Sequence, residues 1–158
     1  MVSASFPRPG ISCSRPTTDT YKLEIVKAGG LNPLLRLLQS PDRKLIDHAV
    51  LCVSNLAFQP TNRSPIIEAG FLQPVVKLLS FKHHENIPFN AARILRNLAA
   101  SPENRRDIVN AGAVQLIREL VLQVSVRIQI QMTCCIENLS LSGMDLPFNP
   151  FSNLILPR

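Results

Sequence analysis

The chain has 158 residues, of which 46% are apolar, so it is long and apolar enough for one globular unit and is not mainly disordered. It has no tryptophan and only 5% aromatic residues, which favours packed helices over a β-sandwich. The net charge of +6 is scattered without a run of five basic residues. It therefore indicates a solvated surface and predicts no nucleic-acid partner. No apolar run approaches the ~20 residues that span a bilayer.

Residues 1–20 are rich in Pro, Ser and Thr and contain little to bury, so they are predicted to be a disordered lead. Myristoylation requires a glycine directly after the initiator, and this chain begins Met1-Val2-Ser3. Cys13 is the only cysteine in the lead, and a single acyl chain gives only marginal membrane binding. The sequence thus predicts a cytosolic chain that reaches a membrane only indirectly, through a partner.

A segment of about fifteen residues then occurs three times. It reads IVKAGGLNPLLRLLQ at 25–39, IIEAGFLQPVVKLLS at 66–80 and IVNAGAVQLIRELVL at 108–122. Alignment places Gly29, Gly70 and Gly112 in register, with periods of 70 − 29 = 41 and 112 − 70 = 42. Internal repetition near 40 residues is typical of a helical solenoid, and the units are predicted at 22–59, 60–101 and 102–142.

Each unit is predicted to contain three helices. The first is short and ends at the Ala-Gly step, where glycine can adopt the left-handed conformation that closes a helix. The second begins directly afterwards, with Pro33 or Pro74 in its first turn, where a missing N–H costs little.

The third helix is predicted to be the longest, at about 12 to 17 residues. It is expected to open at Ser40-Pro41 in the first unit and near Asn86 to Pro88 in the second. The segment Ser101-Pro102-Glu103-Asn104 is expected to cap the first helix of the third unit. Residues 143–158 contain one glycine and three prolines, which predicts an irregular tail. The repeat pattern stops abruptly at both tails. We therefore expect the chain to be a fragment or a short form of a longer repeat protein.

A unit of about 41 residues with an Ala-Gly step near its start and Asn-Leu-[Ala/Ser] near its end resembles the armadillo repeat. The resemblance implies an all-α fold, a right-handed α-solenoid of three armadillo repeats with irregular termini. Three segments are similar in sequence to the vacuolar armadillo proteins of fungi: IVKAGGLNPLLRLLQS, SPIIEAGFLQPVVKLLS and ILRNLAASPENRRDIVNAGAV. That similarity implies a peripheral scaffold on the cytosolic face of the vacuole, active in vacuole inheritance, nucleus–vacuole contact, and cytoplasm-to-vacuole targeting and autophagy.

In armadillo solenoids the third helices line a concave groove, where a ladder of asparagines binds the backbone of an extended peptide. By resemblance Asn55, Asn97 and Asn138 occupy that ladder. A carboxamide suits this task because it carries both a donor and an acceptor. The alternative is that these asparagines only cap their own helices.

The residues beside the ladder suggest which partner would bind. Leu51, Arg93 and Cys134 stand four positions before the asparagines, and Ser54, Arg96 and Glu137 stand one position before them. Importin-like cargo adaptors usually have tryptophan four positions before, and this chain has none. Arg93 and Arg96 would repel a basic signal and favour an acidic or polar segment, unless they are merely solvated. The importin-like adaptor remains the alternative function.

No group of residues predicts an enzyme, a metal site or a cofactor. His83-His84-Glu85 is interpreted as a surface loop, His48 as a groove-edge or packing residue, and Arg105-Arg106-Asp107 as a helix surface. The four cysteines lack C-x-x-C spacing and are expected to be reduced structural thiols. Neither tail can serve as a helical cap, so self-association through the ends of the repeat array is also expected.

Overall fold

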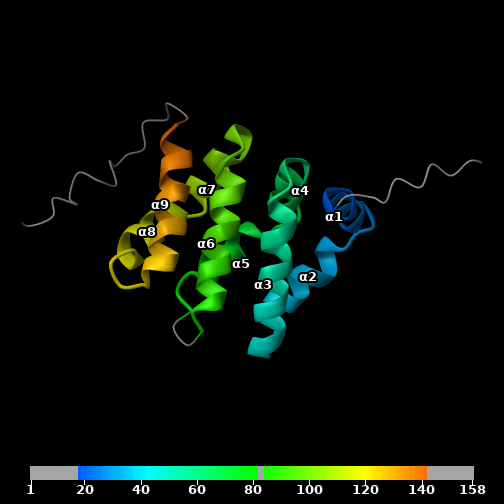
Figure 1. Cartoon of the computed structure of the whole chain (residues 1–158), viewed down its shortest axis with the longest axis horizontal. Helices are drawn as coiled ribbons and strands as arrows, with labels where there is room; N and C mark the ends of the chain where they lie inside the picture. The colour runs from blue at the N-terminus through cyan, green and yellow to red at the C-terminus, as the bar shows by residue number, and fades with distance from the viewer. Residues whose placement is uncertain (1–17, 82–83, 142–158) are drawn as a thin grey trace, which may run out of the picture.

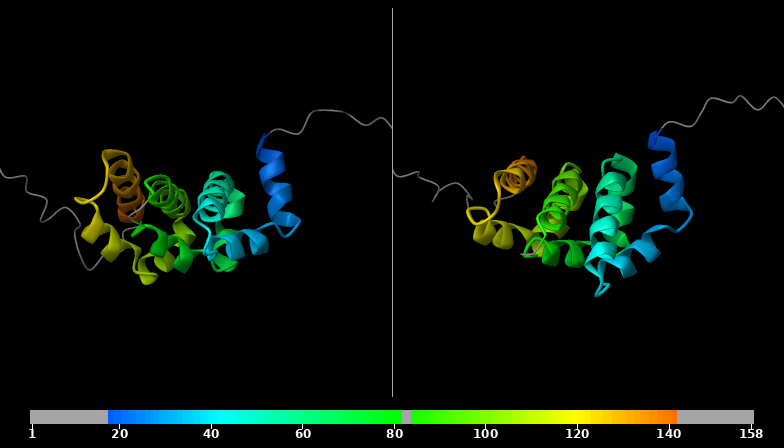
Figure 2. Two further views of the ribbon diagram at one scale, coloured as in Figure 1. Left: turned by 90° about the horizontal axis from the view of Figure 1, so that it is seen from below. Right: turned by 60° about the horizontal axis from the view of Figure 1, so that its bottom comes forward.

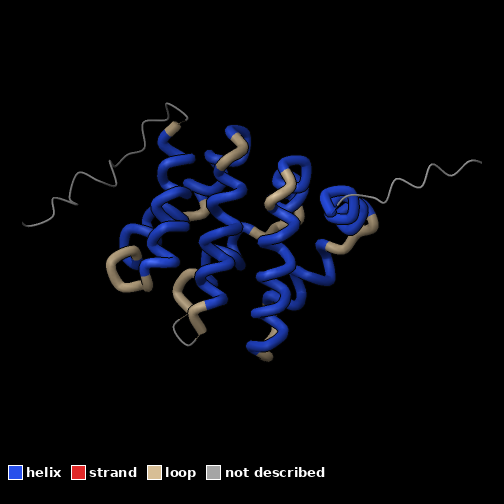
Figure 3. The backbone as a smooth tube through the Cα atoms, in the orientation of Figure 1, coloured by secondary structure: helices blue, strands red, loops and turns tan. Residues whose placement is uncertain are grey.

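The computed structural model describes residues 18–81 and 84–141, and within them it contains helices and no strand (Figure 3). The first unit holds α1 (Thr18–Lys27), α2 (Leu31–Leu38) and α3 (Arg43–Ala57). The second holds a 3-10 helix (Pro60–Asn62), α4 (Arg63–Glu68), α5 (Leu72–Leu78) and α6 (Asn86–Ala99). The third holds a 3-10 helix (Pro102–Asn104), α7 (Arg105–Asn110), α8 (Ala113–Leu120) and α9 (Val126–Ser140). The predicted all-α solenoid is confirmed.

The helices stack in layers along the solenoid. The third helices α3, α6 and α9 lie side by side across the molecule (Figure 1). The second helices α2, α5 and α8 form a separate layer beside them (Figure 2). Because α6 packs against both α3 and α9, it is the central element of the described array.

The Ala-Gly step turns the chain between the first and second helices, as predicted. Gly29, Gly70 and Gly112 have φ of 81°, 85° and 79°, the left-handed region that glycine adopts without a steric penalty. At the second turn the Gly70 N–H donates to the Ile67 carbonyl at 2.9 Å, which closes α4. Pro33 and Pro74 are the third residues of α2 and α5, so they lie in the first turn as expected.

The start of α6 at Asn86 agrees with the prediction, whereas α3 begins later than predicted and the cap predicted before α7 forms without a side-chain hydrogen bond. The side chain of Asp42, not Ser40, caps α3 by accepting a hydrogen bond from the Lys44 N–H at 2.9 Å. Ser40 instead accepts from the Asp42 N–H at 3.1 Å, which orients the capping residue. Ser101 caps no helix with its side chain, and its hydroxyl accepts from Arg63 of the preceding unit at 3.2 Å.

A polar joint connects each first helix to the third helix before it, and we call it the Asn-Arg joint (Asn62-Arg63 and Asn104-Arg105). The Asn62 amide donates to the carbonyls of Leu56 at 3.2 Å and Lys22 at 3.1 Å. Asn104 donates to the Leu98 carbonyl at 3.4 Å in the same way, and 104 − 62 = 42 residues separate the two asparagines. The joint thus supplies a further donor to the carbonyls of Leu56 and Leu98 in the last turns of α3 and α6, and it also ties α1 to the second unit through Lys22.

The arginines of the joint correct one prediction. Arg105 was expected on a helix surface, but it is 7% exposed and its Nε donates to the Ala99 carbonyl at 2.9 Å. Arg63 donates from Nε to the Ala57 carbonyl at 3.3 Å. Burial lowers the pKa of Arg63, and the charge of Glu103 partly offsets that shift. A guanidinium can be buried here because helix-end carbonyls accept its hydrogen bonds.

The first helix begins earlier than the sequence predicted. α1 starts at Thr18, so residues 18–20, which were assigned to the disordered lead, are helical. The rest of the lead and the C-terminal tail lie outside the described residues. Within the described part of the chain, no helix is both long and apolar enough to cross a membrane.

Candidate functional site

The six residues predicted to bind a partner all lie on the third helices. Leu51 and Asn55 belong to α3, Arg93, Arg96 and Asn97 to α6, and Asn138 to α9. They share one side of this layer because residues separated by three or four positions lie on the same face of a helix. We call this surface the ladder face.

Arg93 links the second unit to the first. Its Nε donates to the Ser54 hydroxyl and its Nη2 donates to the Asn55 carboxamide oxygen, both at 2.5 Å. Asn55 therefore has its oxygen engaged within the chain. The pKa of Arg93 is lowered, first by burial and then by the positive charge of Arg96.

Arg96 and Asn138 link the second unit to the third. The Arg96 Nη1 donates to the Gln131 carboxamide at 2.9 Å, and the Asn138 amide donates to the Arg96 carbonyl at 3.0 Å. The alternative in which the arginines are merely solvated is therefore wrong for both of them. Asn138 also does not cap its own helix, because its amide donates to a carbonyl of the neighbouring α6.

Asn97 differs from the other two asparagines. It is 6% exposed, and its side chain forms no hydrogen bond with any part of the chain that the structure describes. Among the described residues, the fully buried side-chain atom without a partner is Oδ1 of Asn90, so the carboxamide atoms of Asn97 are still reached by solvent. A ligand that supplied hydrogen bonds could therefore replace water at Asn97.

A cavity of about 460 Å³ and one of about 310 Å³ are found in the described chain, and the smaller contains the predicted residues. Four of the six predicted residues line it, while Leu51 and Asn138 do not. The full lining consists of Lys22, Ser54, Asn55, Phe58, Arg93, Arg96 and Asn97. We call it the ladder cavity, and it lies between α1, α3 and α6.

Sequence reasoning missed Lys22 and Phe58. The Lys22 ammonium lies 4.9 Å from the centre of the Phe58 ring and 3.0 Å from the Asp19 carboxylate. The repeat register could have indicated Lys22, since 63 − 41 = 22 places it at the position of the joint residue Arg63. Only the fold brings this cation beside Arg93 and Arg96.

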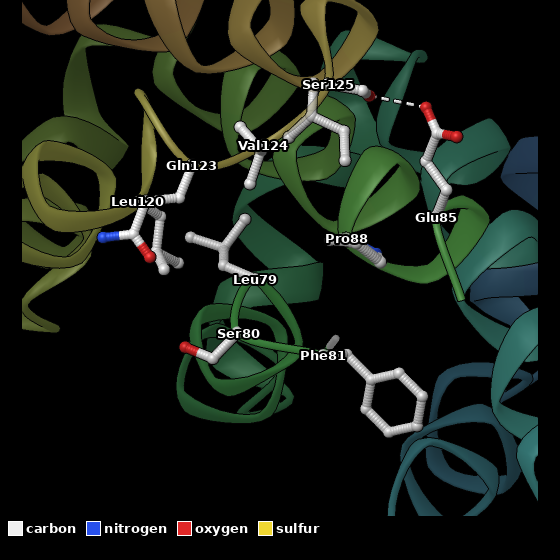
Figure 4. A pocket seen from close by; sticks show the side chains of 10 residues that line it. Leu79, Ser80, Phe81, Glu85, Pro88, Leu120, Gln123, Val124 and Ser125 are labelled. Atoms are coloured by element: carbon white, nitrogen blue, oxygen red, sulfur yellow. Dashed lines mark hydrogen bonds between the residues drawn. The ribbon is translucent and has the colours of Figure 1, made fainter. Parts of the chain in front are cut away.

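The larger cavity lies between the second and third units, away from the ladder residues (Figure 4). Its lining is mostly apolar and includes Leu79, Pro88, Leu120 and Val124. At its rim the Ser125 hydroxyl donates to the Glu85 carboxylate at 2.5 Å (Figure 4). This mostly apolar lining could accommodate an apolar side chain of a partner.

The remaining candidate groups do not converge. Across residues 18–81 and 84–141, no three His, Cys, Asp or Glu side chains gather to hold a metal ion. His48 and His84 are exposed, and His83 lies outside the described residues. Burial raises the pKa of Cys52, and burial followed by the influence of Cys134 raises the pKa of Cys135 to about 12. These two thiols are therefore protonated and unreactive near neutral pH.

Comparison with known proteins agrees with the repeat organisation. The Armadillo/beta-catenin-like repeat family matches residues 18–58, 59–100 and 101–141. Vacuolar protein 8 of Schizosaccharomyces pombe is 47% identical over 125 residues, which cover 78% of this chain and 23% of that protein. Vacuolar protein 8 of Saccharomyces cerevisiae is 43% identical over 126 residues, or 79% of this chain and 22% of that protein. The chain thus spans about a quarter or less of these relatives.

Solved structures give the same fold. A designed armadillo repeat protein superimposes on this chain with a TM-score of 0.72 at 29% identity. The superposition covers 77% of this chain and 52% of the designed chain. A second designed armadillo repeat protein, in complex with the peptide (KR)4, gives a TM-score of 0.70 at 25% identity and covers 80% of this chain and 58% of its own. With three family repeats across most of its length and fungal relatives above 40% identity, the chain belongs to the armadillo repeat family.

Proposed function

We propose that this chain is a non-enzymatic scaffold whose concave ladder face binds an extended segment of a partner protein. The observation behind this proposal is the ladder cavity, which the amide of Asn97 lines together with the guanidinium groups of Arg93 and Arg96. The fold and the names of the relatives favour a scaffold over an enzyme, and an armadillo relative holds a peptide.

The partner segment is proposed to be acidic or polar. Lys22, Arg93 and Arg96 line the cavity, and no carboxylate is among its described lining residues. Cations at a binding surface attract acidic segments and repel basic ones. This charge disfavours the alternative of an importin-like adaptor for basic nuclear localisation signals.

The place of action is proposed from the relatives. Because the similar fungal proteins are vacuolar by name, we place the scaffold at the cytosolic face of the vacuolar membrane. Vacuole inheritance, nucleus–vacuole contact and cytoplasm-to-vacuole targeting are the proposed processes. Recruitment there would depend on the partner bound at the ladder face.

Asn97→Ala tests this function. We expect the acidic octapeptide (DE)4 to bind the parent chain, and the basic peptide (KR)4 to bind far more weakly. Asn97→Ala should weaken (DE)4 binding by about 1 kcal/mol or somewhat more, because one hydrogen-bonding amide is lost. Calorimetric titration measures both affinities.

Asn110→Ala is the matched control, since Asn110 is exposed at the end of α7 and lines neither cavity. Circular dichroism should show unchanged helix content in both variants. Equal (DE)4 affinity for the parent and Asn97→Ala would remove Asn97 from the binding site. Preferential binding of (KR)4 would favour the importin-like alternative.

Self-association through the terminal units is a second expected property. Exposed apolar side chains occur in the first unit at Tyr21 (53%) and Ile25 (43%), and in the last unit at Leu122 (75%) and Leu141 (71%). Apolar surface that no neighbour covers promotes association. We expect the molar mass measured by light scattering to rise with concentration, and a strict monomer throughout the range would contradict this expectation.

A further inference from the structure

We propose that the ladder cavity binds the phosphate group of a phosphorylated serine or threonine in the partner segment. This inference rests on the proposed function and specifies the chemistry of one position in the bound segment. Three features of the cavity support the inference: three cationic side chains line the cavity, contacts within the chain hold them in place, and they keep N–H donors for a ligand.

Three cationic side chains meet in a small space. Lys22 comes from α1, and Arg93 and Arg96 come from α6. Asp19, which pairs with Lys22, is not among the lining residues. A carboxylate ligand brings a charge of −1, whereas a phosphate monoester carries about −1.5 to −2 near neutral pH. The dianion therefore neutralises more of the positive charge in this cavity.

The cations are held in place before any ligand arrives. Ser54 and Asn55 fix the guanidinium of Arg93, and Gln131 fixes that of Arg96. Phe58 and Asp19 hold the ammonium of Lys22. Side chains already ordered lose little conformational entropy on binding. Burial and, to a smaller extent, the charge of Arg96 lower the pKa of Arg93, and a bound anion would offset the repulsion between the two guanidinium groups.

Donors remain available for several acceptor atoms. The hydrogen bonds of Arg93 within the chain use Nε and Nη2, and that of Arg96 uses Nη1, so each guanidinium retains N–H groups. The amide of Asn97, which also lines the cavity, adds a neutral donor. A phosphate offers three acceptor oxygens and a carboxylate offers two, so phosphate uses this donor set more completely.

Three peptide mixtures test the inference on the full chain. Each is a nonapeptide with randomised neutral flanks, and the central residue is phosphoserine, glutamate or serine. We expect the phosphoserine mixture to bind about tenfold more tightly than the glutamate mixture, and the serine mixture to bind most weakly. Fluorescence anisotropy at physiological salt measures all three.

The outcomes separate this inference from the proposed function. Equal binding of the phosphoserine and glutamate mixtures, both above serine, would overturn the phosphate assignment and leave an acidic-segment scaffold. Equal binding of all three would overturn both, because no anion would then be preferred.

Lys22→Gln and Arg96→Gln should each reduce phosphoserine binding by about tenfold. Arg106→Gln is the control. Arg106 is exposed on α7 and does not line the cavity, so the substitution removes the same charge elsewhere on the surface. It should leave binding unchanged. If all three variants bind the phosphoserine mixture as the parent does, or lose affinity equally, the cavity is not the phosphate site. Neither removed side chain belongs to the Asn-Arg joint, and circular dichroism would verify that both variants fold.

Discussion

Leu95→Ala is expected to lower the free energy of unfolding by about 2–5 kcal/mol, the usual cost of emptying a leucine site in a packed core. Leu95 is 0% exposed and lies in α6, the helix that packs against both α3 and α9. In a solenoid each unit is stabilised by its neighbours, and about three repeats are needed for a stable fold. Because typical domains are stable by only ~5–15 kcal/mol, this loss should approach global unfolding.

Leu122→Ala provides the control for this prediction. Leu122 is 75% exposed, so removing the same atoms should change stability by no more than about 0.5 kcal/mol. Urea denaturation followed by circular dichroism compares the two variants. If Leu95→Ala costs no more than Leu122→Ala, the core assignment of α6 is wrong.

Asn62→Leu is expected to cost about 2–3 kcal/mol, although it adds an apolar side chain to a buried position. Asn62 is 1% exposed and donates to the carbonyls of Leu56 and Lys22. Leucine has the same branched shape but leaves the carbonyls of Leu56 and Lys22 without this donor. Since α1 would lose one of its hydrogen bonds to the second unit, the position of Lys22 in the ladder cavity should also be disturbed.

The measurement for Asn62→Leu is thermal unfolding together with binding of the phosphoserine nonapeptide mixture. Asn110→Leu makes the same change at an exposed position of α7 and should be close to neutral. A stability of Asn62→Leu equal to or above that of the parent would mean that the Asn-Arg joint contributes specificity and not stability.

The fold could be predicted from sequence because its determinants are local and repeated. The glycines at Ala-Gly steps need φ near +80°, and Pro33 and Pro74 are tolerated only in a first turn, so these residues mark helix boundaries without tertiary information. The sequence could not decide between Ser40 and Asp42 as the cap of α3, because both side chains can cap and geometry selects Asp42. At Ser101 the hydroxyl accepts a hydrogen bond from Arg63, a tertiary contact that no local pattern predicts.

The partners of the ladder residues depended on tertiary structure. Sequence placed Asn55, Asn97 and Asn138 in equivalent positions, yet their hydrogen bonds differ because each depends on the neighbouring unit. Arg93 of the second unit donates to both Ser54 and Asn55 of the first unit. Equivalent register therefore predicts location on a face, but not which donors and acceptors remain available.

By itself the sequence determined that this chain is a three-unit armadillo solenoid with cations on the third helices. Only the tertiary structure decided that Lys22 joins Arg93 and Arg96 around one cavity, and that Arg105 is buried. The physical reason is that helix periodicity is encoded within each unit of about 41 residues. Hydrogen bonds between units join residues about 35 to 42 positions apart, and no local pattern specifies them.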